Sequence, residues 1–181
     1  MAEESKSAGP PTEMACSVWE GDLPNQVRAA FESAGIQSLT YVGQNFFVCP
    51  SNVVVSVIDY LKTSCGFDYL VELTAVDYPK KPERFELIYI LYSYARNERV
   101  RIKATVADGA KPQTAVHVFI GADWMEREVF DMFGIRFEGH PNMKRILLPE
   151  EWTGFPLRKE YGITQMDNRW VKENLGIESG Q

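Results

Sequence analysis

Three consecutive segments between residues 69 and 106 limit the fold most, because each has the length and composition of a β-strand. Residues 69–77 and 85–94 are rich in β-branched and aromatic residues, and the second segment is apolar on both faces. From 99 to 106, apolar side chains alternate with basic ones, which predicts one face on a core and a basic face outward. We therefore expect residues 85–94 to form a central strand. The basic face is either solvated or docks an acidic partner.

A helix and a strand pair are expected before these strands. Leu23 to Ala34 carries a helical apolar face, with Asp22 as its N-cap and Gly35 as its end. Short strands at 39–42 and 46–49 would flank a hairpin connector at 43–45.

Residues 52–64 fit two structures, since their valines favour a strand while their apolar residues also share one helical face. The length of the segment favours a helix, capped by Ser51 or Asn52. A further helix begins near Asp123, which is a suitable N-cap, and Gly134 ends it. This order predicts a two-layer α+β fold: a helix-strand-strand-helix-three-strand core with a mixed or antiparallel sheet, followed by a helix and an extended C-terminal segment.

The chain has 181 residues, enough for one domain with a sizeable core, and a net charge of −6. An acidic chain of this kind does not suit a dedicated nucleic-acid binder. Residues 1–22 hold five acidic residues against one lysine and are expected to form a disordered tail, leaving an α+β core at 23–135 and a partner-docking C-terminal segment at 136–181. The tail resembles neither a secretory signal nor a mitochondrial transit peptide, and no apolar run reaches the ~18 residues that span a bilayer.

The cysteines Cys16, Cys49 and Cys65 are odd in number and widely spaced, which supports neither a disulfide framework nor a Cys-x-x-Cys metal site. Three cysteines cannot by themselves ligate a four-cysteine iron–sulfur cluster. Cys49 and Cys65 lie in or beside core-like segments, where a buried thiol is the usual role. The sequence also has neither a phosphate-binding glycine loop nor a nucleophile elbow. A reducing compartment is the expected setting.

Carboxylates crowd the helix that begins near Asp123: it carries Glu126, Glu128 and Asp131, and His140 follows shortly after. Such a cluster could hold two metal ions or form an acid–base pair. Against this, neither of the two histidines falls at the Glu-x-x-His spacing that helical carboxylate metal sites use. A small metalloenzyme using these four side chains is the alternative from another functional class.

A role in contacts accounts for more residues of this region. Arg127 and Arg145 are expected to pair with the carboxylates of the helix, and buried ion pairs of this kind specify geometry. The helix also presents a large apolar surface built from Trp124, Val129, Met132 and Phe133. After residue 137 the chain is irregular but rich in prolines and large apolar groups, so it must lie along a surface. That surface is either its own domain or a partner.

A spaced signature runs through this region. It consists of Glu126-Arg127-Glu128, Asp131, Met132-Phe133, His140, Lys144 and Ile146-Leu147, and it continues in Gly154-Phe155-Pro156-Leu157-Arg158-Lys159-Glu160-Tyr161. In these residues the chain resembles the C subunit, also called the thirty-kilodalton subunit, of respiratory complex I, the proton-pumping NADH:quinone oxidoreductase. The resemblance is specific over residues 124–161 and weaker but consistent from Leu23 onward. Asp123 stands where the family has Asn.

The resemblance implies a non-catalytic structural subunit of the peripheral arm, which helps to assemble the quinone-reducing module. It implies that the chain holds no catalytic residue, metal or cofactor, that FMN, iron–sulfur clusters and quinone belong to partner subunits, and that the D and B subunits of the complex pack against it. The expected location is peripheral, on the cytoplasmic face of a bacterial cell membrane. The same subunit of a ferredoxin-dependent photosynthetic-type complex or of a membrane-bound hydrogenase is the nearest alternative.

The residues expected to serve structure or interfaces are Trp124, Glu126, Arg127, Glu128, Asp131, His140, Pro141, Lys144, Arg145, Phe155, Pro156, Arg158 and Tyr161.

Overall fold

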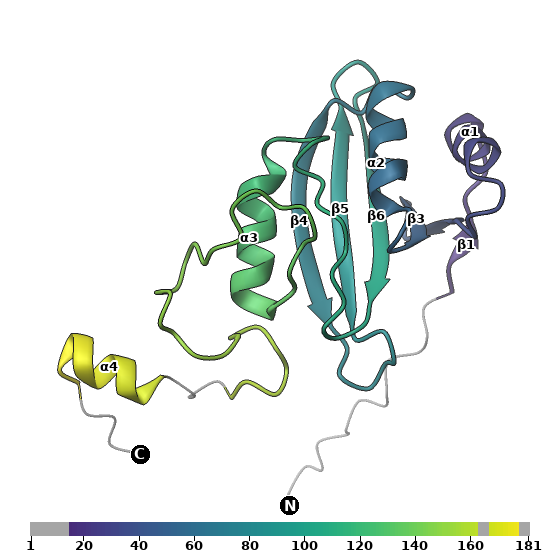
Figure 1. The fold of residues 1–181 in the computed structure, drawn as a ribbon. Helices are drawn as coiled ribbons and strands as arrows, with labels where there is room; N and C mark the ends of the chain where they lie inside the picture. The colour runs from purple at the N-terminus through teal and green to yellow at the C-terminus, as the bar shows by residue number, and fades with distance from the viewer. Residues whose placement is uncertain (1–14, 163–166, 178–181) are drawn as a thin grey trace, which may run out of the picture.

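The computed structural model describes residues 15–162 and 167–177, and its centre is one mixed β-sheet (Figure 1). The elements in chain order are β1 (Ser17–Val18), α1 (Asp22–Ala30), β2 (Gln37–Tyr41), β3 (Gln44–Pro50), α2 (Val54–Thr63), β4 (Tyr69–Asp77), β5 (Phe85–Ser93), β6 (Glu98–Val106), α3 (Ala122–Phe133) and α4 (Asn168–Leu175).

The sheet has the strand order β1-β2-β3-β6-β5-β4. Only β3 and β6 run parallel, and the other neighbours are antiparallel. The parallel pair arises because α2 carries the chain from β3 to the far edge of the sheet, and the β4–β5–β6 meander then returns to β3. The predicted α+β class and mixed sheet are confirmed, and β5 is an interior strand as its apolar faces indicated.

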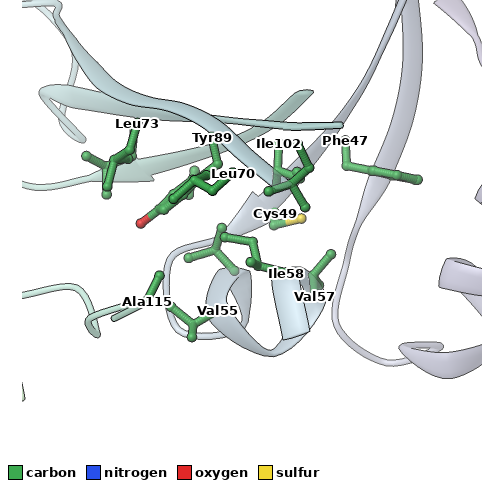
Figure 2. Close-up of a cluster of buried hydrophobic side chains, with 14 of the residues drawn as sticks. Phe47, Cys49, Val55, Val57, Ile58, Leu70, Leu73, Tyr89, Ile102 and Ala115 are labelled. Carbon is green, nitrogen blue, oxygen red and sulfur yellow. The ribbon is translucent and has the colours of Figure 1, made fainter. Parts of the chain in front are cut away.

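A single hydrophobic core lies between the sheet and the helices. Alternate residues of β5 are buried, and α2 contributes Val57, Ile58 and Leu61. Figure 2 shows the packing, with the α2 side chains facing Tyr89 and Ile102 of the sheet. In Figure 1, α2 lies over β6 and α3 lies beside β4. The meander thus supports α3 through β4, and α3 in turn carries the candidate site.

Both core-like cysteines are buried, as predicted, while Cys16 is exposed. Burial raises the pKa of the Cys49 thiol to about 12, so this side chain behaves as a small apolar group.

The expected helix caps are wrong. The residues before α1, α2 and α3 are Gly21, Val53 and Gly121, and none makes a side-chain cap. Asp22 and Asp123 instead lie inside the first turns of α1 and α3, where a carboxylate interacts favourably with the helix dipole. The end of α3 was better predicted, since its C-cap glycine adopts φ +79°, a left-handed conformation.

The domain extends beyond both ends of the expected core. Ser17–Val18 pairs with β2, and Trp19 packs on Phe47 with ring centroids 4.8 Å apart, although both precede the expected boundary at residue 23. The rest of the expected tail, residues 1–14, lies outside the described residues. At the other end, α4 forms where only extended chain was expected, and its Trp170 packs on Trp152 with centroids 5.7 Å apart.

The outward face of β6 is basic, and burial alternates along the strand as predicted. Lys103 pairs with Glu86 at 3.0 Å, and Arg101 donates to Gln44 at 2.9 Å. Neighbouring side chains therefore engage two of these cations, which favours solvation of this face over docking of an acidic partner. In the part of the chain that the structure describes, no helix combines the length and apolarity needed to cross a bilayer.

The β2–β3 hairpin turns on two residues rather than the expected three. Val42 and Gly43 have φ +47° and +70°, the positive values that both central residues of a type I′ turn require. Glycine adopts this conformation freely, but a β-branched side chain is strained by it.

Replacing Val42 with Asn is expected to stabilise the chain. Asn tolerates positive φ, so Val42→Asn should raise the free energy of unfolding by about 1 kcal/mol in chemical denaturation. Val42→Thr is the matched control, because it makes the same exposed position more polar but keeps the β-branch. Equal effects of the two substitutions would show that the backbone strain is not the cause.

Candidate functional site

The candidate site is the contact between α3 and residues 138–161, which we call the arm. The arm contains no long regular element, yet it lies along its own domain. Its backbone is tied to the domain at both ends: the Thr114 amide donates to the Glu138 carbonyl at 2.9 Å, and the Leu157 amide donates to the Met132 carbonyl at 3.1 Å. The sequence left open whether this segment lies on its own domain or on a partner. These hydrogen bonds show that it lies along its own domain.

Asp131 is the main anchor of the arm. Its buried Oδ2 accepts the backbone amides of Ile146, Leu147 and Leu148 at 3.0, 2.7 and 2.9 Å, and its Oδ1 pairs with Arg145 at 2.6 Å. Burial alone would raise the pKa of Asp131, but these hydrogen bonds outweigh it and hold the pKa below its usual range. The carboxylate is therefore charged at neutral pH and fully used inside the chain.

Arg145 extends this anchor to the next part of the arm. Its Nη2 donates to the carbonyls of Trp152 and Gly154 at 2.9 and 3.0 Å, so one guanidinium closes the loop between them. Its Cζ also lies 5.2 Å from the centre of the Phe155 ring, in cation–π geometry. The predicted pairing of Arg145 with a carboxylate of α3 is confirmed.

The far end of the arm is held by a second arginine. Arg158 Nε donates to the Phe133 carbonyl at 2.7 Å, and its other nitrogens reach the Asp108 carboxylate at 3.1 and 3.0 Å. The guanidinium also lies 5.1 Å from the Phe155 ring centre, so Phe155 contacts both arginines of the arm. Gly134 gives this ring space, since a Cβ there would come within 2.6 Å of it.

A group of ion pairs formed by Asp77, Arg84 and Glu160 lies next to Arg158. Asp77 accepts two hydrogen bonds from Arg84 at 2.8 and 2.9 Å and one from the Lys159 amide at 2.7 Å. Arg84 above all holds the pKa of Asp77 below its usual range. Arg84 also pairs with Glu160 of the arm. The β4–β5 loop and the arm are thereby joined through charges that lie far apart in sequence.

A second buried carboxylate of α3, Glu126, faces a different segment. Its Oε2 accepts the Thr114 hydroxyl at 2.6 Å and its Oε1 accepts the Ala115 amide at 2.6 Å. His140 Nε2 lies 4.0 Å from Oε2. Burial raises the pKa of Glu126 to about 7 despite these two hydrogen bonds. Glu126 therefore holds the loop before α3, and of the three carboxylates predicted as possible partners of the arginines it is Asp131 that pairs with Arg145.

Three of the predicted residues point elsewhere. Arg127 donates to the carbonyls of Lys144 and Arg145 at 3.2 and 3.1 Å, so its partners are backbone oxygens rather than carboxylates. Trp124 is 62% exposed, whereas Val129 and Phe133 of the same predicted apolar surface are buried in the core. Its ring lies 5.5 Å from the Arg127 guanidinium. Glu128 is exposed.

The other predicted residues belong to the arm. His140 lies against the start of α3, and Tyr161 packs where a side chain at Gly154 would stand. Pro156 is half-buried, whereas Pro141 and Lys144 are exposed. The sequence did not single out Asp77, Arg84, Asp108 or Thr114. Their partners across the structure lie 12 to 82 residues away, except in the Asp77–Arg84 pair, whose spacing across a short loop offered a local signal.

Two of the side chains proposed as ligands in the metal-site alternative already have other partners. Asp131 is occupied by amides and Arg145, and Glu126 by Thr114 and Ala115. Within residues 15–162 and 167–177, no group of three or more His, Cys, Asp or Glu side chains is placed to hold a metal ion.

Comparison with known proteins identifies the family. Residues 47–167 match the family described as "Respiratory-chain NADH dehydrogenase, 30 Kd subunit", a range that runs from β3 through the whole arm. The chain belongs to this family. The resemblance inferred from the signature residues is thereby confirmed.

Three similar proteins that are named as NADH-quinone oxidoreductase subunits agree with membership of the 30 Kd subunit family. The C subunit of NADH-quinone oxidoreductase from Ruegeria pomeroyi is 41% identical over 128 residues, which cover 70% of this chain and 64% of that protein. Its counterpart from Trichlorobacter lovleyi is 48% identical over 112 residues, 61% of this chain and 69% of that one. A Bdellovibrio bacteriovorus protein, named as a C/D subunit of NADH-quinone oxidoreductase, is 41% identical over 120 residues, 66% of this chain but only 21% of its own length. The chain thus spans less than two thirds of the Ruegeria and Bdellovibrio proteins.

A solved structure shares the fold of this 30 Kd subunit. It is a chain of the membrane-bound sulfane sulfur reductase, described as an archaeal respiratory membrane complex. The two superpose with a TM-score of 0.68, covering 88% of this chain and 92% of the other, at 23% identity. This likeness shows that the sheet and helices form a recurring architecture.

Asp131→Asn is expected to release the arm. The substitution removes the charge that Arg145 pairs with and leaves one acceptor oxygen for donors that now use two, at a cost of about 3 to 5 kcal/mol. Limited proteolysis should cut within residues 142–152 while the sheet stays intact. Asp59→Asn, an exposed aspartate on α2, is the control. Protease resistance equal to the unmodified chain would contradict the role of Asp131.

Gly134→Ala should destabilise the chain more than Gly109→Ala. The two glycines have almost the same φ, +79° and +81°, so both substitutions cost about 1 to 2 kcal/mol in backbone strain. Only at Gly134 would the new methyl group meet the Phe155 ring, while nothing lies within 4 Å at Gly109. The difference between the two free energies of unfolding measures the docking of Phe155, and a difference near zero would contradict it.

Proposed function

We propose that this chain is a non-catalytic structural subunit of the peripheral arm of a proton-translocating NADH:quinone oxidoreductase, where it helps to assemble the quinone-reducing module. Family membership over residues 47–167 carries the proposal. A role in rigid positioning is supported by the contacts of the signature charges Asp131 and Arg145, which fix the arm to the domain.

The D subunit of the complex is the first proposed neighbour, and the B subunit is the second. The Bdellovibrio protein named as a C/D subunit supports the first, since a single chain holds its two parts at high effective concentration. FMN, iron–sulfur clusters and quinone would belong to partner subunits. The chain would then reach the cytoplasmic face of a bacterial cell membrane through the complex.

The partner surface that we propose runs along the outer side of α3. Trp124 and Glu128 lie four residues apart on α3 and therefore share a face, and Ile120 lies in the turn just before the helix. Ile120 and Trp124 are 86% and 62% exposed. Exposed apolar side chains rimmed by polar groups mark protein interaction sites, and tryptophan is enriched among the residues that dominate interface energies. A partner that presents an apolar surface with a nearby cation would fit this stripe. Pro141 and Lys144 are the exposed signature residues of the arm and would lie at its margin.

Deletion of the gene tests the function. The expected result is loss of the assembled complex on native gels and of NADH oxidation linked to quinone in membranes. Normal assembly and oxidation after deletion would refute the proposal. The related alternatives separate by electron donor: membranes reduced by ferredoxin or hydrogen instead of NADH would point to the photosynthetic-type complex or the hydrogenase.

Loss of the outer stripe should impair assembly without unfolding the chain. Trp124→Ala combined with Glu128→Gln is expected to weaken subunit association by about 2 kcal/mol or more, roughly thirtyfold, because exposed aromatic anchors dominate interface energies. Turnover per assembled complex should stay normal, and so should the melting temperature of the isolated chain.

Tyr94→Ala is the matched control, since this tyrosine is 66% exposed but lies at the end of the sheet. Full assembly of the double variant would contradict the proposed surface. Full assembly with lost turnover would indicate a chemical role instead.

A further inference from the structure

Glu126 is a buried carboxyl group that the scaffold role does not require to be ionisable. Two segments converge on it: residues 112–116, through Thr114 and Ala115, and the beginning of the arm, through His140. The same two segments are joined to each other, since the Glu138 amide donates to the Pro112 carbonyl at 2.8 Å. A change at Glu126 therefore acts on both segments together.

The hydrogen bonds around Glu126 suit both forms of its carboxyl group. Oε1 accepts the Ala115 amide in either form, while the Thr114 hydroxyl, which accepts the Val116 amide at 3.2 Å, can donate to Oε2 of the ionised group or accept from the neutral one. His140 Nδ1 accepts the Asn142 amide at 3.0 Å, which assigns the ring proton to Nε2. That Nε2 lies 3.2 Å from the Asp123 carbonyl oxygen, its acceptor.

The site also contains unused polar atoms. In the part of the chain that the structure describes, Tyr89 Oη and Asp123 Oδ1 are buried without a hydrogen-bond partner, although Asp123 Oδ1 lies 3.1 Å from His140 Nε2. Figure 2 shows the Tyr89 side chain running from the sheet toward the side where Ala115 lies. Burial first, and the charge of Glu126 second, raise the pKa of Tyr89, so its hydroxyl keeps its proton. Buried polar atoms without partners indicate a place that gains from water or from a proton.

We propose that Glu126 is the proton-binding element of a latch: the neutral carboxyl group lets residues 112–116 and 138–142 close over α3, and the ionised form favours their local opening. Opening would admit water to the carboxylate and to the two unused polar atoms. The titratable groups facing Glu126 are Asp123 of α3, His140 of the arm and Tyr89 of β5, and the 112–116 segment faces it with uncharged donors only.

The stability of the closed latch is expected to fall as the pH rises. Burial, the largest cause, and the charge of Asp123 raise the pKa of Glu126 from 4.5 to about 7, while Thr114 and Ala115 oppose them. A raised folded pKa means that the stabilising contribution is complete below 4.5 and is lost as the pH rises through 7. If opening restores the ordinary value, the opening equilibrium is about tenfold larger at pH 8 than at pH 6.

Amide hydrogen exchange on the full chain, without partners, tests the latch independently of the proposed function. After correction for the intrinsic pH dependence of exchange, the protection of the Thr114, Ala115 and Asn142 amides should fall about tenfold from pH 6 to pH 8. Amides of β5 serve as the internal reference and should not change.

Glu126→Gln should abolish this dependence, because the amide side chain fills the same space and does not titrate. Glu32→Gln, an exposed glutamate just after α1, should leave it intact. A flat profile in the unmodified chain, or the same profile in Glu126→Gln, would overturn the proposal. If Glu126→Gln does not fold, carbon-13 NMR titration of the Glu126 carboxyl in the unmodified chain decides: a midpoint near 7 supports the latch, and one near 4.5 overturns it.

Discussion

The hydrogen bonds and the ion pair between Asp131 and the arm are the interactions on which the shape of the arm depends. A carboxylate buried against a helix is costly unless it is paired, and here one side chain collects three backbone amides and a guanidinium. Because the amides belong to consecutive residues, the chain must wrap around the carboxylate. Arg145 plays the same part with the opposite charge, because its guanidinium donates to the backbone carbonyls of Trp152 and Gly154. An irregular segment thus acquires one shape without a helix or strand of its own.

Glu126 and Asp131 show how environment divides two carboxylates on one helix. Both side chains are buried, yet the pKa of Asp131 lies below its usual range and that of Glu126 rises to about 7. Asp131 has a guanidinium and three amides to compensate its lost hydration, whereas Glu126 has one hydroxyl, one amide and a neighbouring Asp123. The first residue is a permanent anchor, and the second is the group that we propose as the proton-binding element of the latch. The outer side of the same helix, with Trp124 and Glu128, is free for a proposed partner.

Much of the fold was readable from the sequence. The three strands of the meander, the helical choice for α2 and the glycine end of α3 were all predicted, because period-two alternation, segment length and left-handed glycine are local properties. Helix starts were predicted less well. Asp22 and Asp123 have the chemistry of caps, but the backbone begins each helix one or two residues earlier, and local propensity does not decide between adjacent frames. The turn between β2 and β3 was expected at residues 43–45, but it begins one residue earlier, at Val42.

By itself, the sequence determined the α+β class, the buried strands and the family, since each depends on residue type and spacing along the chain. Only the tertiary structure decided which charges meet. Arg127 was expected to pair with a carboxylate but binds carbonyls, while Asp77, Arg84 and Asp108 were not expected at all and join the arm to the sheet. A charged side chain can accept many partners of opposite sign. The choice among them depends on which segments the packed core brings within about 3 Å, a distance at which sequence separation no longer counts.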